Sequence, residues 1–135
     1  MAYGINISSV ISKLNRDSKK LLEQVDNEIL RGLEEVVVRA KAEAPAFIAP
    51  SINVEKKGEF QYSLNAENRV SAYFEFGTGR YAESYIPGIE QEWQLIASDY
   101  IVNQQGTTPE NPYMYPSYQS VMPRVFEKIQ KDLNA

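Results

Sequence analysis

The stretch LLEQVDNEILRGLEEVVVRA, Leu21 to Ala40, decides the fold class of this chain. Its apolar residues recur at spacings of three, four or seven, which is the pattern of one face of an α-helix. The other faces are charged, and Glu35 and Arg39 have the i,i+4 spacing of a helical ion pair. The residues of the apolar face, extended towards the N-terminus, are Ile11, Leu14, Leu21, Val25, Ile29, Leu33, Val36 and Ala40.

The expected helix is long. Ser8 or Ser9 is a suitable N-cap, and Pro45 ends the pattern. At 1.5 Å per residue such a helix spans about 50 Å, which is more than one core of this size covers. We therefore expect either a break, at 15–18 or at Gly32, or an apolar stripe that partly contacts another subunit.

After Pro45 the apolar periodicity changes from 3.6 to 2. Alternation within 52–54, 60–64 and 70–76 predicts three short strands, joined by polar turns at 56–58 and 65–68. In the third strand Ala72, Phe74 and Phe76 would face the core, with Tyr73 and Glu75 on the other face. Three strands with short turns predict an antiparallel meander packed on the long helix.

The C-terminal half gives weaker signals. Residues 89–103 suit either a helix or a hairpin turning at Ser98 and Asp99, and their aromatic and β-branched content favours the hairpin. Three prolines make 107–116 an extended segment. Ser117 would then cap a last helix. Its expected apolar face is Val121, Val125, Ile129 and Leu133.

The prediction is thus one α+β domain, 1–135, with a long N-terminal helix packed on a small antiparallel sheet and a C-terminal helix. A length of 135 residues and a hydrophobic content of 43% fit a single globular domain. No apolar stretch has the length of a membrane span, and no signal peptide is recognisable at the N-terminus. We expect no contact with membranes.

The composition excludes much chemistry. The chain has no histidine, the commonest general base and metal ligand, and no cysteine for thiol catalysis or disulfides. A net charge of −4 argues against a protein that wraps nucleic acid through its phosphates.

The glycine-containing stretch AYFEFGTGRYAE, Ala72 to Glu83, is the one candidate for a reactive site. Gly-Thr-Gly is half of a phosphate-binding loop, but no third glycine and no lysine complete it. Glu75 and Glu83 can form a carboxylate pair only if something fixes their separation, and the sequence shows nothing that does. We expect no enzyme activity, no catalytic residue, no cofactor and no metal.

An architectural role fits the same residues better. Two glycines around Thr78 permit a tight turn that presents the next side chains, and the prolines stiffen a second tyrosine-rich segment. Tyrosine is favoured at interfaces, although each of these tyrosines can instead complete the core of its own domain. The candidate interface residues are Glu75, Gly77, Thr78, Gly79, Arg80, Tyr81, Tyr113, Met114 and Tyr115.

The order of these motifs resembles a family of tailed-phage structural proteins. These are the neck, or head–tail joining and tail-completion, proteins of siphophages and their prophages. Family members show a helix ending in Ala-Pro, a strand closing on Glu-Phe-Gly-Thr, and a Pro-Phe-(Met/Leu)-x-Pro-Ala segment before the last helix. Here these fall at 42–45, 75–78 and 112–117, with Tyr113 in place of phenylalanine and Ser117 in place of alanine. AFIAPSINV stands where the family usually has Asp-Thr-Gly and Leu-Arg-x-Ser.

The resemblance implies a homo-oligomeric ring, sixfold or twelvefold, in the virion neck, assembled in the cytoplasm of a bacterial host. The ring would contact neighbouring connector, adaptor and tail proteins. Double-stranded DNA would pass through its lumen without specific binding, and an acidic wall would repel the phosphates. A tail terminator or minor tail component is the nearest alternative, and a small dimeric bacterial binding module is a more distant one.

Overall fold

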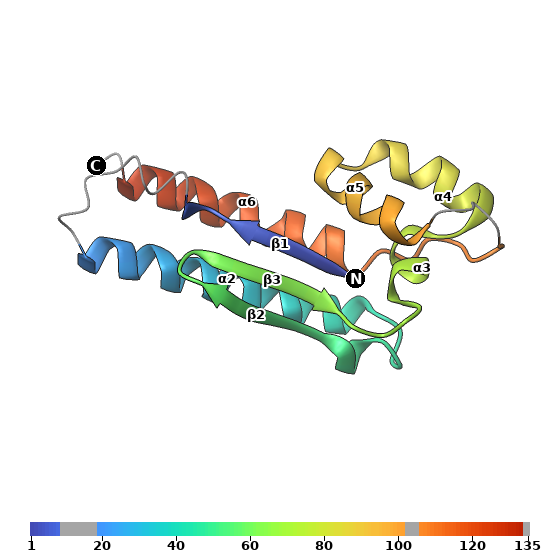
Figure 1. Ribbon diagram of the computed structural model, residues 1–135, viewed down its shortest axis with the longest axis horizontal. Helices are drawn as coiled ribbons and strands as arrows, with labels where there is room; N and C mark the ends of the chain where they lie inside the picture. The colour runs from blue at the N-terminus through green and yellow to red at the C-terminus, as the bar shows by residue number, and fades with distance from the viewer. Residues whose placement is uncertain (9–18, 102–105, 134–135) are drawn as a thin grey trace.

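Two long helices form one layer of the protein and a three-stranded sheet forms the other (Figure 1). The structure is a computed structural model that describes residues 1–8, 19–101 and 106–133. Helix α2 (Lys19–Glu43) and helix α6 (Met114–Leu133) lie side by side along the length of the molecule. The sheet lies along the same direction.

The sheet consists of β1 (Ala2–Asn6), β2 (Ile52–Gly58) and β3 (Gln61–Ala66) in the order β1-β3-β2. Both pairings are antiparallel, and Leu64 of the central strand lies opposite Tyr3 on one side and Val54 on the other. The β2–β3 ladder contains a register shift between Lys56 and Gly58.

The core lies between the sheet and α2. The face of α2 predicted from the sequence is the buried one, since five of its residues are at most 1% exposed, namely Val25, Ile29, Leu33, Val36 and Ala40. Tyr62 and Leu64 of β3 enter the same core. At the edge of this core Tyr62 Oη donates to the carbonyl oxygen of Asp26 (3.0 Å) and to its carboxylate, which Lys56 also binds. Burial opposes ionisation of Asp26, but the hydrogen bonds from Lys56 and Tyr62 outweigh it and lower the pKa of this carboxyl.

Three short helices occupy one end of the molecule (Figure 1), and of the 3₁₀ turns one precedes β2 and the other lies between α4 and α5. The helices are α3 (Ser71–Phe76), α4 (Gly79–Tyr85) and α5 (Gln91–Tyr100), and the turns are η1 (Ala49–Ser51) and η2 (Ile86–Gly88). Trp93 of α5 is fully buried and stacks on Tyr3 of β1, with ring centroids 4.6 Å apart. Tyr118 of α6 meets both rings edge-on, so aromatic packing joins α5 to the strand and to the last helix.

The structure confirms the α+β class, the long helix that ends before Pro45, and the C-terminal helix. It corrects several details of the sheet. The third strand is β1, whereas 70–76, expected as a strand, contains helix α3. Strands β2 and β3 continue through residues expected in turns, so the hairpin turns at 59–60 and the next turn lies at 68–70.

The helices need corrections as well. The predicted break at Gly32 is wrong because α2 is continuous there, and the alternative break at 15–18 lies outside the described residues. The preferred hairpin in 89–103 is wrong, since α5 occupies most of that stretch. Helix α6 starts at Met114, so Ser117 is not its cap, and the Ser117 hydroxyl donates to the carbonyl of Tyr113 (2.6 Å).

Gly32 lies on the side of α2 that packs closely against α6. A Cβ atom at this position would lie 2.9 Å from Val125 Cγ2 and 3.0 Å from Met122 Sδ. Gly32 therefore serves helix packing, and its lack of a side chain lets the two backbones come together.

Replacement of Gly32 by leucine should separate the two helices and destabilise the protein by about 2–3 kcal/mol, because overpacking forces neighbouring side chains and backbone to move. Urea denaturation followed by circular dichroism measures the loss. Glu34→Leu, an exposed position on the same helix, is the matched control and should stay within about 0.5 kcal/mol of the parent. Equal stability of the two variants would contradict this role for Gly32.

Candidate functional site

The Gly77-Thr78-Gly79 turn connects α3 to α4 and is tightly built. Gly77 has φ +80°, which favours glycine, and a Cβ there would lie 2.9 Å from the amide nitrogen of Glu110. The Thr78 amide donates to the carbonyl of Thr108 (2.9 Å), and Thr78 Oγ1 accepts from the Thr108 amide (2.8 Å). The turn and the proline-containing segment that precedes α6 thus hold each other in place.

Glu75 lies next to this turn, on α3, and is completely buried. Its Oε1 accepts a hydrogen bond from the backbone amide of Met114 (2.6 Å), the first residue of α6. Amides in the first turn of a helix have no helical acceptor, so the Glu75 carboxyl supplies one and links α3 to the start of α6. Its second oxygen, Oε2, is buried with no hydrogen-bond partner among the described residues.

The buried Glu75 carboxyl has a raised pKa. Burial raises the pKa of Glu75 to about 8, and the backbone N–H groups of Met114, Tyr115 and Tyr113 only partly oppose this rise. At pH 7 the group is therefore mostly protonated. Burial and the nearby Glu75 carboxyl together raise the pKa of the Tyr85 and Tyr113 hydroxyls, so both tyrosines remain neutral at physiological pH.

Further contacts strengthen the link between α3 and α6. Tyr113 is fully buried, and its hydroxyl donates to the backbone carbonyl of Ser71 (2.9 Å) at the start of α3. The Ser71 hydroxyl in turn donates to the carbonyl of Ala66 (2.8 Å) at the end of β3. This chain of bonds connects the sheet, α3 and α6. We call the cluster of Ser71, Glu75, Tyr113 and Met114 the α3–α6 joint.

The nine candidate interface residues divide into two groups. Six of them are buried within the protein, namely Glu75, Gly77, Thr78, Gly79, Tyr113 and Met114. The other three reach the surface: Arg80 is exposed, and Tyr81 and Tyr115 are half-buried. The sequence analysis placed Glu75 on the outer face of a strand, opposite a core face of Ala72, Phe74 and Phe76. This prediction was wrong because α3 is a helix.

Arg80 is the prominent surface residue of this region. Its guanidinium lies 5.1 Å from the ring centroid of Tyr81 and donates to the Tyr81 hydroxyl (3.2 Å). Arg80 and Glu75 do not pair with each other, since one is exposed and the other is fully buried. The surface therefore presents a cation on an aromatic ring, next to the Gly77-Thr78-Gly79 turn.

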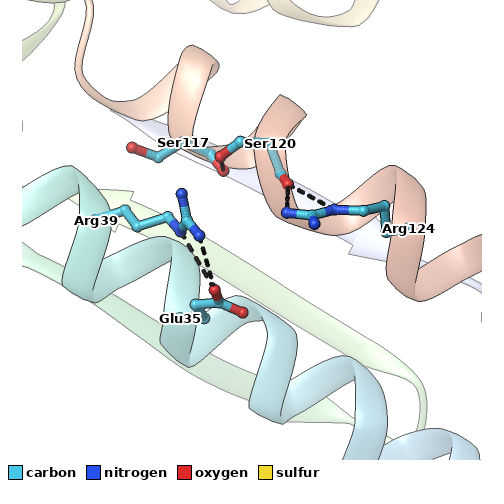
Figure 2. Close-up of polar contacts among 5 residues, drawn as sticks. All are labelled: Glu35, Arg39, Ser117, Ser120 and Arg124. Atoms are coloured by element: carbon cyan, nitrogen blue, oxygen red, sulfur yellow. Dashed lines mark hydrogen bonds and ion pairs between the residues drawn. The ribbon is translucent and has the colours of Figure 1, made fainter.

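A groove of about 310 Å³, which the sequence analysis did not predict, opens between the end of α2 and the start of α6. Its walls are Arg39, Ala42 and Glu43 on one side and Pro112, Pro116, Ser117 and Ser120 on the other. In Figure 2, Arg39 is held by Glu35 (3.1 Å), and Arg124 Nε donates to the carbonyl of Ser120 (3.1 Å). Both arginines are thus engaged within their own helices.

Comparison with protein-family models, with curated proteins and with solved structures finds no significant match to this chain. None of the described helices combines the length and the apolar character needed to cross a membrane. Over the described ranges, no group of three or more acidic, histidine or cysteine side chains is placed to hold a metal ion.

The acidity of Glu75 makes stability depend on pH. Its pKa is raised from 4.5 in the unfolded chain to about 8 in the folded protein, so the folded state binds the proton more tightly between these values. The stabilisation is complete below pH 4.5 and is lost as the pH rises through 8. Relative to Glu75→Gln, which stays neutral, the parent should lose up to about 1.4 kcal/mol of unfolding free energy per pH unit in this window.

Urea denaturation of both proteins at several pH values between 5 and 9 measures this difference. Glu83→Gln, which changes an exposed carboxylate, is the matched control and should follow the parent at every pH. Parallel curves for the parent and Glu75→Gln would contradict the assignment.

Proposed function

We propose that this chain is a virion structural protein that forms a ring in the neck of a tailed phage, between the capsid portal or its adaptor and the tail tube. The sequence support is the order of three motifs along the chain, at 42–45, 75–78 and 112–117. Two of these motifs meet in space, because Glu75 of the second bonds to Met114 of the third.

The observation that carries the proposal is that Arg80 and Tyr81 form an ordered pair on the surface before any partner binds. They directly follow the tight Gly77-Thr78-Gly79 turn, and a Cβ atom at Gly77 would lie 3.1 Å from Tyr81 Cβ. A surface that is ordered before binding loses little conformational entropy when a partner docks. An arginine with an adjacent tyrosine is also a composition that interfaces favour.

Exposed apolar side chains supply a second argument. Val38, Leu95 and Phe47 are large apolar residues that remain 69%, 62% and 54% exposed. Phe47 meets Phe74 of α3 edge-on, with ring centroids 5.3 Å apart, and the adjacent Tyr73 is also exposed. Removal of apolar surface from water contributes about 25 cal/mol per Å², so subunit contacts at these places would stabilise an assembly.

The proposed partners are further copies of this chain and the connector, adaptor and tail proteins on either side of the ring. DNA would pass through the lumen without specific contacts. The net charge of −4 agrees with a wall that does not retain phosphates. A tail terminator would use the same surfaces at the upper end of the tail, and the order of neighbouring genes separates the two roles.

Immunogold labelling of virions with antibody against this chain tests the location. We expect label at the head–tail junction. Label confined to the distal tail, or absent from the particles, would contradict the proposal.

Reversal of the charge at Arg80 tests the surface itself. Arg80→Glu should fold normally, since the side chain is exposed, but it should fail to enter virions when it is supplied in place of the parent. Arg31→Glu, at an exposed arginine of α2, is the control that should be incorporated. Thermal unfolding checks that both variants fold, and quantitative blotting of purified particles measures incorporation. Equal incorporation of the two would show that Arg80 makes no essential contact.

A further inference from the structure

Strand β1 is an edge strand whose outer side pairs with no other strand among the described residues. The Met1 ammonium donates to the carbonyl of Ala66 (3.0 Å), and the Ala66 amide donates to the carbonyl of Met1 (2.8 Å). In an antiparallel ladder this pattern repeats at every second residue, so Tyr3 and Ile5 also bond to β3. Ala2, Gly4 and Asn6 consequently direct their N–H and C=O groups away from β3, and nothing in the described ranges accepts or donates a bond to these groups.

The opposite edge of the sheet carries features that prevent strand addition. Strand β2 has a register irregularity between Lys56 and Gly58, and two lysines occupy this part of the strand. Bulges and edge lysines are the usual protection of an edge against pairing. Strand β1, with the sequence AYGIN, has no charge, no proline and no irregularity in its pairing.

The outward-directed residues of β1 also leave room for another strand. Ala2, Gly4 and Asn6 are exposed, and a Cβ atom at Gly4 would meet nothing within 4 Å. Their side chains are small or uncharged, so they neither cover the free backbone groups nor repel a neighbour.

We propose that the outer edge of β1 pairs with β1 of a second copy of this chain, antiparallel and about a two-fold axis at Gly4. In this register Gly4 lies opposite Gly4 of the second copy, Ala2 opposite Asn6, and Tyr3 opposite Ile5. Each outward residue then donates its N–H and accepts through its C=O, and the two sheets become one.

The self-complementarity of the strand identifies the second copy as the occupant. Tyr3 opposite Ile5 is an aromatic–β-branched pair, which favours antiparallel pairing. Because β1 carries no charged side chain, the two-fold arrangement opposes no like charges. An isologous contact of this kind requires the same surface on both copies, and the free edge meets that requirement.

The contact is small and should form a weak, concentration-dependent dimer, since a single strand pair is below the roughly 1,200 Å² of a standard stable interface. It is independent of the proposed neck function. A two-fold contact through β1 would join two free subunits, or two rings face to face. The contacts proposed for the neck function use different surfaces, namely Arg80 and the exposed aromatic residues.

Gly4→Pro and Gly4→Ala form a matched pair for the test. Proline removes the outward N–H and leaves the bonds to β3 intact, and alanine keeps the N–H and adds only a Cβ in open space. Sedimentation velocity over a wide concentration range measures dimerisation. Gly4→Ala should dimerise like the parent, while Gly4→Pro should raise the dissociation constant roughly twenty-five-fold, from two lost backbone hydrogen bonds at about fivefold each.

Amide hydrogen exchange of the unmodified protein tests the same contact without a variant. The amides of Gly4 and Asn6 should exchange fast in dilute solution and slowly at high concentration, whereas those of Tyr3 and Ile5 should be slow in both. A parent that is monomeric throughout, or a Gly4→Pro variant that dimerises like Gly4→Ala, would overturn the proposal. Such a result leaves the immunogold test of the neck location unaffected, so the two proposals fail separately.

Discussion

The hydrogen bond from the Met114 amide to the buried Glu75 carboxyl is the contact on which the arrangement of this protein depends. Helix α6 begins inside the protein, where the buried amide of Met114 needs a hydrogen-bond acceptor. Glu75 meets this need at the cost of burying a carboxyl, which explains the raised pKa. Since α6 also packs along α2, the bond joins the short helices to the helix–sheet body.

The long helix could be predicted from the sequence because its apolar spacing is repeated over many turns. The stripe of α2 contains enough apolar positions to fix its period, and the structure buries the expected side. Strand β1 has only five residues, and its partner β3 lies far along the chain, so no local pattern marks it. Helix α3 was mistaken for a strand because six residues are too few to separate the two periods. Its buried residues form i,i+4 pairs, Ser71 with Glu75 and Ala72 with Phe76, alongside the alternation that suggested a strand.

The candidate site was predictable in part. The glycine turn and the exposed Arg80 were found from local chemistry, since glycines mark positions that other residues fit poorly. The buried role of Glu75 could not be found this way, because its partner Met114 is 39 residues away and a glutamate is ordinarily exposed. Tyr113 and Met114 were expected on a surface arm, yet both complete the core, an alternative that the sequence analysis left open for the tyrosines only. The groove at Arg39 depends on the packing of α2 against α6, which no single stretch of sequence encodes.

A measurement of the pKa of Glu75 tests the central role of the α3–α6 joint most directly. A titration of the side-chain carboxyl carbons by nuclear magnetic resonance, with Glu75 assigned by comparison with Glu75→Gln, gives its pKa in the folded protein. Burial against the first turn of α6 predicts a value near 8. A value near the ordinary 4.5 would mean that the carboxyl is solvated, and that Glu75 does not hold α6 in the way described.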